Sequence, residues 1–85
     1  MDPNQDVEEW RTIAEQEQAL RDSIEELGEP CRSLIELIYF ENPPATHEEV
    51  AEKLTLPLGS IGPTRARCLD KLRTRLRRRG VTANF

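Results

Sequence analysis

The side chains best suited to chemistry are the lysines and arginines gathered toward the C-terminal end of this 85-residue chain. Residues 53–85 contain nine Lys and Arg and one Asp, a net charge of +8, although the whole chain carries −4. Guanidinium and ammonium groups at this density bind phosphate, and phosphate contacts supply much of the affinity of DNA-binding proteins. Because Asp70 is the single acid of the helix expected there, ion pairs within that helix cannot neutralise its arginines. This segment is the candidate site for a polyanion.

The remainder of the chain has the opposite charge. Residues 1–52 contain fifteen Asp and Glu and three Arg, a net charge of −12. Such a sharp asymmetry suggests that the two halves face different partners. The alternative is that the acidic half only keeps a basic helix soluble.

Other chemistry has little support in the sequence. The chain has one histidine, His47, no pairing of a nucleophile with a base, and no glycine-rich phosphate loop, so we expect neither an enzyme nor a cofactor. His47 should be solvated, and we expect no metal site.

Cys31 and Cys68 are far apart, so we expect reduced, partly buried thiols, with a disulfide as the alternative. No apolar run reaches the roughly 20 residues of a membrane span and no secretory leader opens the chain, so we expect a cytoplasmic protein with no membrane partner.

The elements that must position the basic segment are helical throughout. The first helix is predicted to run from near Asp6 to just before Gly28, with one apolar stripe, and the pattern fits one long helix or two stacked ones. Trp10 and Ile13 belong either to the core or to an exposed stripe that meets another protein or domain. The other members of the stripe are Leu20, Ile24 and Leu27.

The next helix is predicted to begin at Pro30 and to stop at residues 42–44, Asn-Pro-Pro. Its segment 34–40 is the most hydrophobic in the chain, so we expect it to form the centre of the core. Thr46 and Glu49 have the spacing of a capping box and predict the start of a third helix. That helix should face inward with Val50, Ala51 and Leu54.

A turn at residues 55–57 leads into a fourth helix, and residues 80–85 form a flexible tail. The predicted fold is therefore all-α, a four- to five-helix bundle that ends in a helix-turn-helix. Residues 1–27 form an acidic helix that packs on or leads into the domain, and residues 28–79 form the helix-turn-helix domain. The predicted buried stripe of the fourth helix is Leu58, Ile61, Cys68, Leu69, Leu72 and Leu76.

The helix-turn-helix prediction depends on three small or apolar residues, Ala51, Leu56 and Ile61, at intervals of five. Two residues depart from the usual pattern. Thr55 occupies a turn position where glycine and a positive φ are common, which indicates a different turn or some strain. Pro63 would kink the last helix unless that helix starts late, with Ser60 as its N-cap and Pro63 as its third residue.

Three stretches carry a family resemblance. GSIGPTRARCLDKLR looks like the recognition helix of bacterial RNA polymerase sigma factors of the extracytoplasmic-function type. LGEPCRSLIELIYFE is similar to the start of region 4 of these factors, and EEVAEKLTLPLGSI resembles their helix-turn-helix. The resemblance covers residues 19–78, about two-thirds of the chain, with the motifs in order. Nothing in the sequence resembles the domain that reads the minus-10 element, so we expect either an excised domain or a free-standing region-4 module.

The resemblance implies a DNA-binding domain that recognises the minus-35 element of a double-stranded promoter and docks on the β flap of the RNA polymerase core to direct transcription initiation. An anti-sigma factor could compete for the same surfaces. The alternative is a protein-interaction module that binds the flap or an anti-sigma factor and has little DNA binding of its own. The residues that the resemblance places at DNA are Thr46, Ser60, Thr64, Arg65, Arg67 and Lys71, and those it places at a protein partner are Leu34, Ile38 and Tyr39.

Overall fold

The fold is built from helices and turns alone within residues 3–82, the part of the backbone that the computed structural model describes; side chains are described for residues 15–82. This confirms the all-α prediction. The elements are α1 (Pro3–Glu26), α2 (Cys31–Ile35), a π turn (Glu36–Phe40), α3 (His47–Leu54), a 3-10 turn (Leu58–Ser60) and α4 (Ile61–Arg78).

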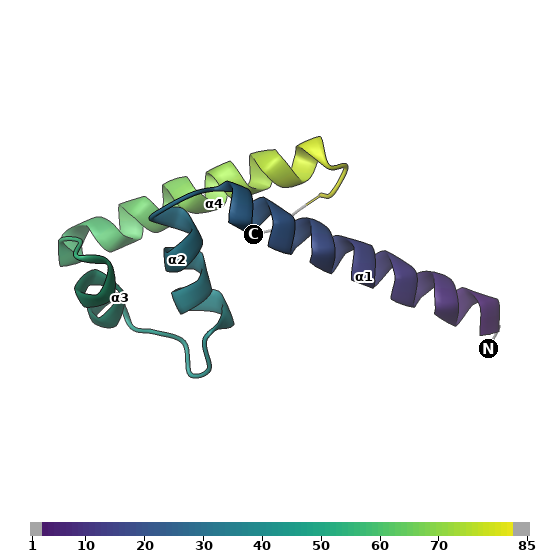
Figure 1. The fold of residues 1–85 in the computed structure, drawn as a ribbon, viewed down its shortest axis with the longest axis horizontal. Helices are drawn as coiled ribbons and strands as arrows, with labels where there is room; N and C mark the ends of the chain where they lie inside the picture. The colour runs from purple at the N-terminus through teal and green to yellow at the C-terminus, as the bar shows by residue number, and fades with distance from the viewer. Residues whose placement is uncertain (1–2, 83–85) are drawn as a thin grey trace.

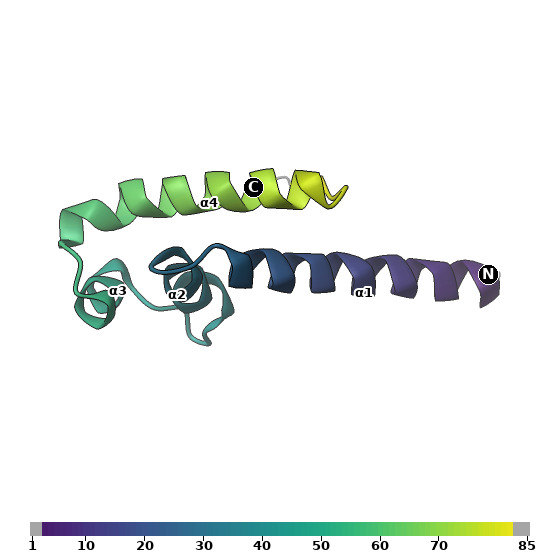
Figure 2. The ribbon, with the colours of Figure 1, turned by 45° about the horizontal axis from the view of Figure 1, so that its top comes forward.

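Helix α1 is one continuous helix that begins earlier than predicted, at Pro3. Its C-terminal part packs against α2 and α4, while its N-terminal part extends away from the other helices (Figures 1 and 2). The molecule is accordingly elongated, with extents of 52 × 28 × 18 Å. The side chains of Trp10 and Ile13 lie outside the described residues, so the two interpretations of their stripe stay open.

Helix α4 lies across the other helices and organises the core (Figure 2). Val50 of α3 is fully buried, with Ala51 and Leu54 packed partly buried beside it, as the sequence predicted. Burial of apolar area at this crossing is the main source of stability. The buried apolar residues are Ile24, Cys31, Leu34, Ile35, Val50, Ile61, Cys68, Leu72 and Leu76.

Only the first residues of the hydrophobic segment 34–40 lie in the core. This corrects the prediction that the whole segment forms its centre. Leu34 and Ile35 are fully buried, but Tyr39 is 47% exposed and Phe40 is 56% exposed. A π turn holds more residues than an α turn, so the side chains after Glu36 rotate out of register with the buried face of α2. Leu58 is also exposed, because it lies in the 3-10 turn before α4 and not on the buried stripe of α4.

The two cysteines form a disulfide, and the expectation of reduced thiols was wrong. Cys31 opens α2 and Cys68 lies within α4, with their Cα atoms 5.2 Å apart. The two residues are 37 positions apart in sequence, and only the crossing of α2 over α4 brings them together. Across the described residues, no cluster of His, Cys, Asp and Glu could hold a metal ion.

The local signals around α3 and α4 were predicted well. Thr46 and Glu49 form the capping box, and Thr55 adopts the left-handed conformation with φ 55°. Helix α4 begins at Ile61, so Pro63 sits in its first turn, where a missing N–H costs no helical hydrogen bond. Ser60 holds the N-cap position, but its hydroxyl donates to the Pro57 carbonyl at 2.7 Å and does not cap α4. None of the helices within residues 3–82 has the length and apolar character that crossing a membrane requires.

Candidate nucleic-acid interface

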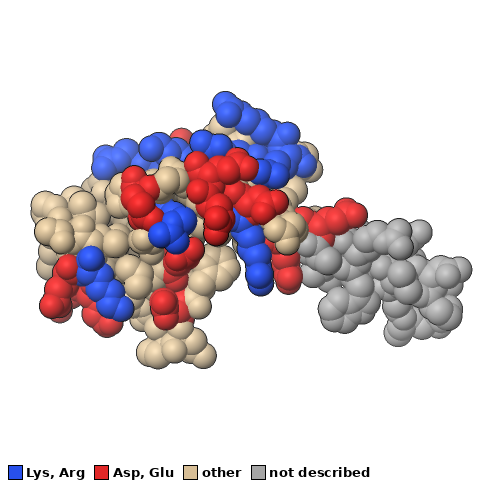
Figure 3. All heavy atoms as spheres, viewed as in Figure 1, with Lys and Arg blue, Asp and Glu red and all other residues tan. Residues whose placement is uncertain are grey.

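We call residues 61–71 the first half of α4, and residues 72–79, which include its C-cap residue Arg79, the second half. The cationic side chains of the first half form the candidate interface. Arg65, Arg67 and Lys71 are all exposed on this helix. Lys and Arg side chains follow α4 along one edge of the molecule, with Asp and Glu side chains below them in the same view (Figure 3). The cationic edge is therefore a continuous feature of the surface.

The two arginines of this half are held by neutral hydroxyl groups. The Arg65 guanidinium donates to the Tyr39 hydroxyl at 3.3 Å, and the Arg67 guanidinium donates to Thr64 Oγ1 at 3.2 Å. Among the side chains of residues 15–82, neither arginine nor Lys71 forms an ion pair with a carboxylate. Their full positive charge therefore remains available to a polyanion.

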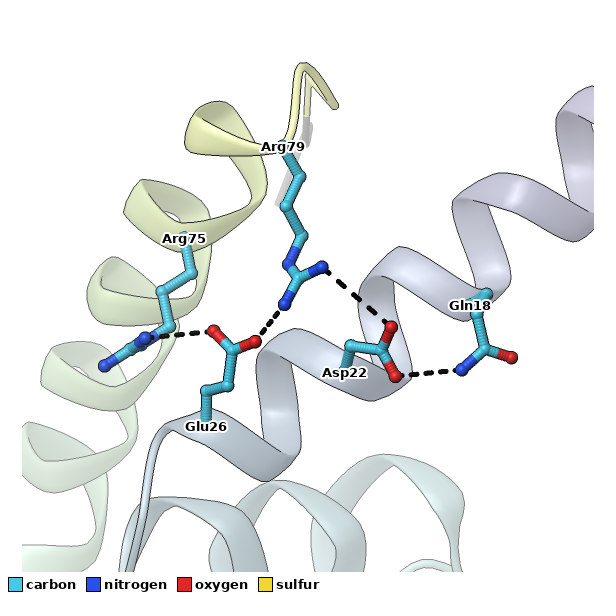
Figure 4. Close-up of polar contacts among 5 residues, drawn as sticks. All are labelled: Gln18, Asp22, Glu26, Arg75 and Arg79. Carbon is cyan, nitrogen blue, oxygen red and sulfur yellow. Dashed lines mark hydrogen bonds and ion pairs between the residues drawn. The ribbon is translucent and has the colours of Figure 1, made fainter.

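The second half of α4 is paired with the acidic helix α1. Glu26 accepts from Arg75 at 3.1 Å and also contacts Arg79, whose other nitrogen lies 3.9 Å from Asp22 (Figure 4). The Gln18 side-chain amide donates to Asp22 at 2.9 Å and extends this network along α1. The acidic half of the chain thus pairs with part of the basic helix, and the expectation that the two halves face different partners stays a prediction.

One further pair lies within α4 itself. The Arg73 guanidinium lies 3.4 Å from the carboxylate of Asp70. Arg77 and Arg78, by contrast, are exposed and form no ion pair with the side chains that the structure describes. The prediction considered only pairing within the helix, and it therefore missed the neutralisation from α1.

Three of the residues predicted to contact DNA carry hydroxyl groups that are already engaged. Thr64 is buried, with 9% of its surface exposed, and its hydroxyl accepts from Arg67, so its inclusion among the exposed DNA-facing residues is corrected. Thr46 is exposed, but its hydroxyl accepts from the Glu49 amide in the capping box. Ser60 is half-buried and donates to a carbonyl of its own turn.

The three residues predicted to contact a protein partner differ in how far the structure exposes them. Leu34 is completely buried and lies on no surface, because it faces the α2–α4 crossing. Ile38 is half-buried and Tyr39 is exposed. Tyr39 also borders an apolar groove of about 210 Å³ between α1, the π turn and α4, lined by Leu20, Ile24, Ile35, Tyr39, Phe40, Leu69 and Leu72.

Sequence reasoning missed Phe40 and Leu69 as surface residues of this groove. The aromatic pair at positions 39 and 40 ends an apolar run directly before residues 42–44, Asn-Pro-Pro. That position at the end of an element was the available signal, since the last turn of a helix is often exposed.

An ion-pair cluster at the start of α2 shifts the pKa values of Glu29 and Arg32. The pKa of Glu29 is lowered by a hydrogen bond from the Ser33 side chain, and the neighbouring Arg32 lowers it further. The pKa of Arg32 is raised by its hydrogen bond and ion pair with Glu29, 2.6 Å away, and by Glu36 at 3.1 Å. This cluster stabilises the α1–α2 connection and lies away from the cationic edge of α4.

Comparisons with protein-family models, with curated proteins and with solved structures gave no match to this chain. The functional argument therefore depends on the geometry above and on the resemblance of the three sequence stretches.

Proposed function

We propose that this chain binds DNA as a helix-turn-helix domain, with α3 as the first helix and the first half of α4 entering the major groove. The observation that carries the proposal is the set of Arg65, Arg67 and Lys71, which are exposed and have no carboxylate partner among the described side chains. Unneutralised cations on an exposed helix are the electrostatic requirement for contact with the phosphate backbone. The left-handed Thr55 between the two helices fits the sharp turn that this motif uses.

The resemblance to region 4 of sigma factors supports a particular kind of DNA-binding domain. We infer that the DNA is a promoter minus-35 element and that binding directs transcription initiation by RNA polymerase. Arg65, Arg67 and Lys71 are the side chains that we assign to DNA. Thr46, at the start of α3, has an exposed position compatible with a backbone phosphate.

The groove supports the protein-binding part of the same proposal. All of its lining residues are hydrophobic, and Tyr39 and Phe40 expose about half of their surfaces beside it. Exposed aromatic side chains beside an apolar groove are typical of a surface that receives a partner helix. The polymerase β flap or an anti-sigma factor is the partner that the resemblance implies. A protein-interaction module with little DNA binding of its own is the second candidate function, and the groove is the observation that favours it.

A non-enzymatic role in the cytoplasm belongs to the same proposal. The single histidine, His47, is exposed in the first turn of α3. The disulfide is compatible with a reducing compartment because Cys68 is fully buried and Cys31 is 5% exposed. A thiolate must reach a disulfide sulfur to reduce it, so burial slows the reaction.

The test is selection of bound duplexes from a randomised 30-bp library, followed by titration of the selected duplex at several salt concentrations. The proposal predicts enrichment of one motif, and affinity that falls steeply as salt rises. Retention of binding by Arg65→Ala and Arg67→Ala variants would contradict the assignment of α4. Phe40→Asp, with Asn42→Asp as a control that adds the same charge at an exposed position outside the groove, tests the second function. Phe40→Asp should abolish binding to isolated polymerase core while leaving DNA binding in place, and retained binding would contradict the second function.

A further inference from the structure

One hydrogen bond joins the apolar groove to the cationic edge of α4. The Arg65 guanidinium, in the second turn of α4, donates to the hydroxyl of Tyr39, in the π turn, across 26 positions of sequence. It is the only hydrogen bond between side chains that connects these two elements among the described residues.

The Tyr39 side chain forms part of the wall of the groove. It lines the groove together with Ile35 of α2 and Leu69, one helical turn after Arg65 on α4. An aromatic side chain has only two rotatable bonds, so packing along the groove wall holds its hydroxyl at a nearly fixed point. The hydroxyl can therefore act as a fixed acceptor for a long, flexible side chain.

The chemistry of the acceptor matters as much as its position. An arginine loses side-chain conformational entropy when it is fixed at a ligand, and an earlier tether removes part of that cost. A carboxylate tether, such as Glu26 provides for Arg75, neutralises the charge at the same time. The Tyr39 hydroxyl orders Arg65 and leaves its charge intact.

The geometry points to Tyr39 as a positioning residue for Arg65 in DNA binding. This inference depends on the proposed function. It adds that a residue of the groove wall, and not of the DNA-facing helix, orders one of the DNA-binding side chains before DNA arrives.

The test is a double-mutant cycle with Tyr39→Phe and Arg65→Ala, read by fluorescence anisotropy with a random-sequence 30-bp duplex at low salt. The phenylalanine keeps the ring in the groove and removes only the hydroxyl. We expect Tyr39→Phe to weaken DNA binding about threefold in the wild-type background and not at all in the Arg65→Ala background. Arg67→Ala is the matched control: because Arg67 donates to Thr64, the threefold effect of Tyr39→Phe should persist in that background.

Thermal unfolding of Tyr39→Phe and the NMR signal of the Arg65 side chain separate positioning from a structural role. We expect an unchanged melting temperature and a shifted, more mobile Arg65 signal in the absence of DNA. If Arg65→Ala weakens binding but Tyr39→Phe does not, the positioning role is overturned and the proposed function stands. An equal effect of Tyr39→Phe in both backgrounds also overturns it. If the wild-type chain binds no duplex at all, both proposals fail.

Discussion

The two halves of α4 both carry basic residues but have very different electrostatic surroundings. In the first half, Arg65 and Arg67 contact only neutral hydroxyl groups. In the second half, Arg75 and Arg79 contact the carboxylates of Asp22 and Glu26 on α1. The difference comes from the direction of α1, whose acidic C-terminal end lies beside only the last turns of α4 (Figures 1 and 4).

This comparison shows why net charge is a poor guide to function for this chain. The formal charge of −4 would argue against a polyanionic partner if the charges were mixed evenly. Instead the structure pairs Arg75 and Arg79 with acids of α1 and leaves Arg65, Arg67 and Lys71 without a carboxylate partner among the described side chains. Arg75 and Arg79 then serve to hold α1 in place, and the cations of the first half are left to bind.

The largest expected effect comes from loss of the disulfide, which joins α2 to α4 at Cys68. This residue lies near the point where the two halves of α4 meet. The bond closes a loop across 37 positions, and its loss should lower the free energy of unfolding by about 4 kcal/mol on the chain-entropy model. Reduction should therefore lower the melting temperature by roughly 15–30 °C, measured by circular dichroism.

The control for this prediction is the Cys31→Ser/Cys68→Ser variant, whose melting temperature should not respond to reductant. Two free thiols in the protein purified under oxidising conditions would show that the bond does not form. A fully reduced protein, verified by its mass, that melts at the same temperature would contradict the stabilising role.

The comparison between the halves predicts opposite consequences for two matched double variants. Arg65→Ala/Arg67→Ala should weaken DNA binding by about 10- to 100-fold, because two unneutralised contacts are lost, with little change in stability. Arg75→Ala/Arg79→Ala should change DNA affinity less than about twofold and should lower the melting temperature instead. Anisotropy titration and thermal unfolding of both proteins check this, and similar losses of affinity in the two variants would remove the distinction.

Glu26→Gln removes the carboxylate that pairs with Arg75 and Arg79, so the second half of α4 should become less neutralised, as the first half is. The pairs are partly exposed, with 43% of the Glu26 side chain accessible, so we expect only about 1 kcal/mol of lost stability and a melting temperature lower by about 4–8 °C. DNA affinity should rise about two- to fourfold because two arginines are released. The neighbouring Glu25 is exposed and has no ion pair within the described region, so Glu25→Gln should show neither effect once salt screens its long-range field.

The smallest effect concerns the turn that places the first half of α4. Thr55 has φ 55°, which a β-branched residue adopts at a cost that glycine avoids, partly offset by the greater freedom of glycine in the unfolded chain. Thr55→Gly should raise stability by about 0.5 kcal/mol, seen as a slightly higher urea midpoint. Thr55→Ala keeps the Cβ atom and should bring no comparable gain; equal gains in both variants would mean that the backbone at this position is not strained.

Much of the fold was predictable because its signals are local. The capping box at Thr46 and Glu49 and the tolerated Pro63 each depend on residues within one helical turn. The disulfide and the pairing of Glu26 with Arg75 depend on how distant helices cross, and no spacing in the sequence records that crossing. The exposure of Tyr39 followed from a π turn, whose shift of register is invisible in the hydrophobic pattern. At the candidate site, sequence reasoning found the cations but could not tell which of them would be neutralised.

The measurement that tests the central claim most directly is the salt dependence of DNA binding for the wild-type chain and the two arginine double variants. The slope of log K against log salt falls by about 0.9 for each phosphate contact that is lost. The account predicts a slope smaller in magnitude by about 1.8 for Arg65→Ala/Arg67→Ala and an unchanged slope for Arg75→Ala/Arg79→Ala. The same loss of slope in both variants, or in neither, would contradict the claim that Arg65 and Arg67 meet DNA while Arg75 and Arg79 are held by α1.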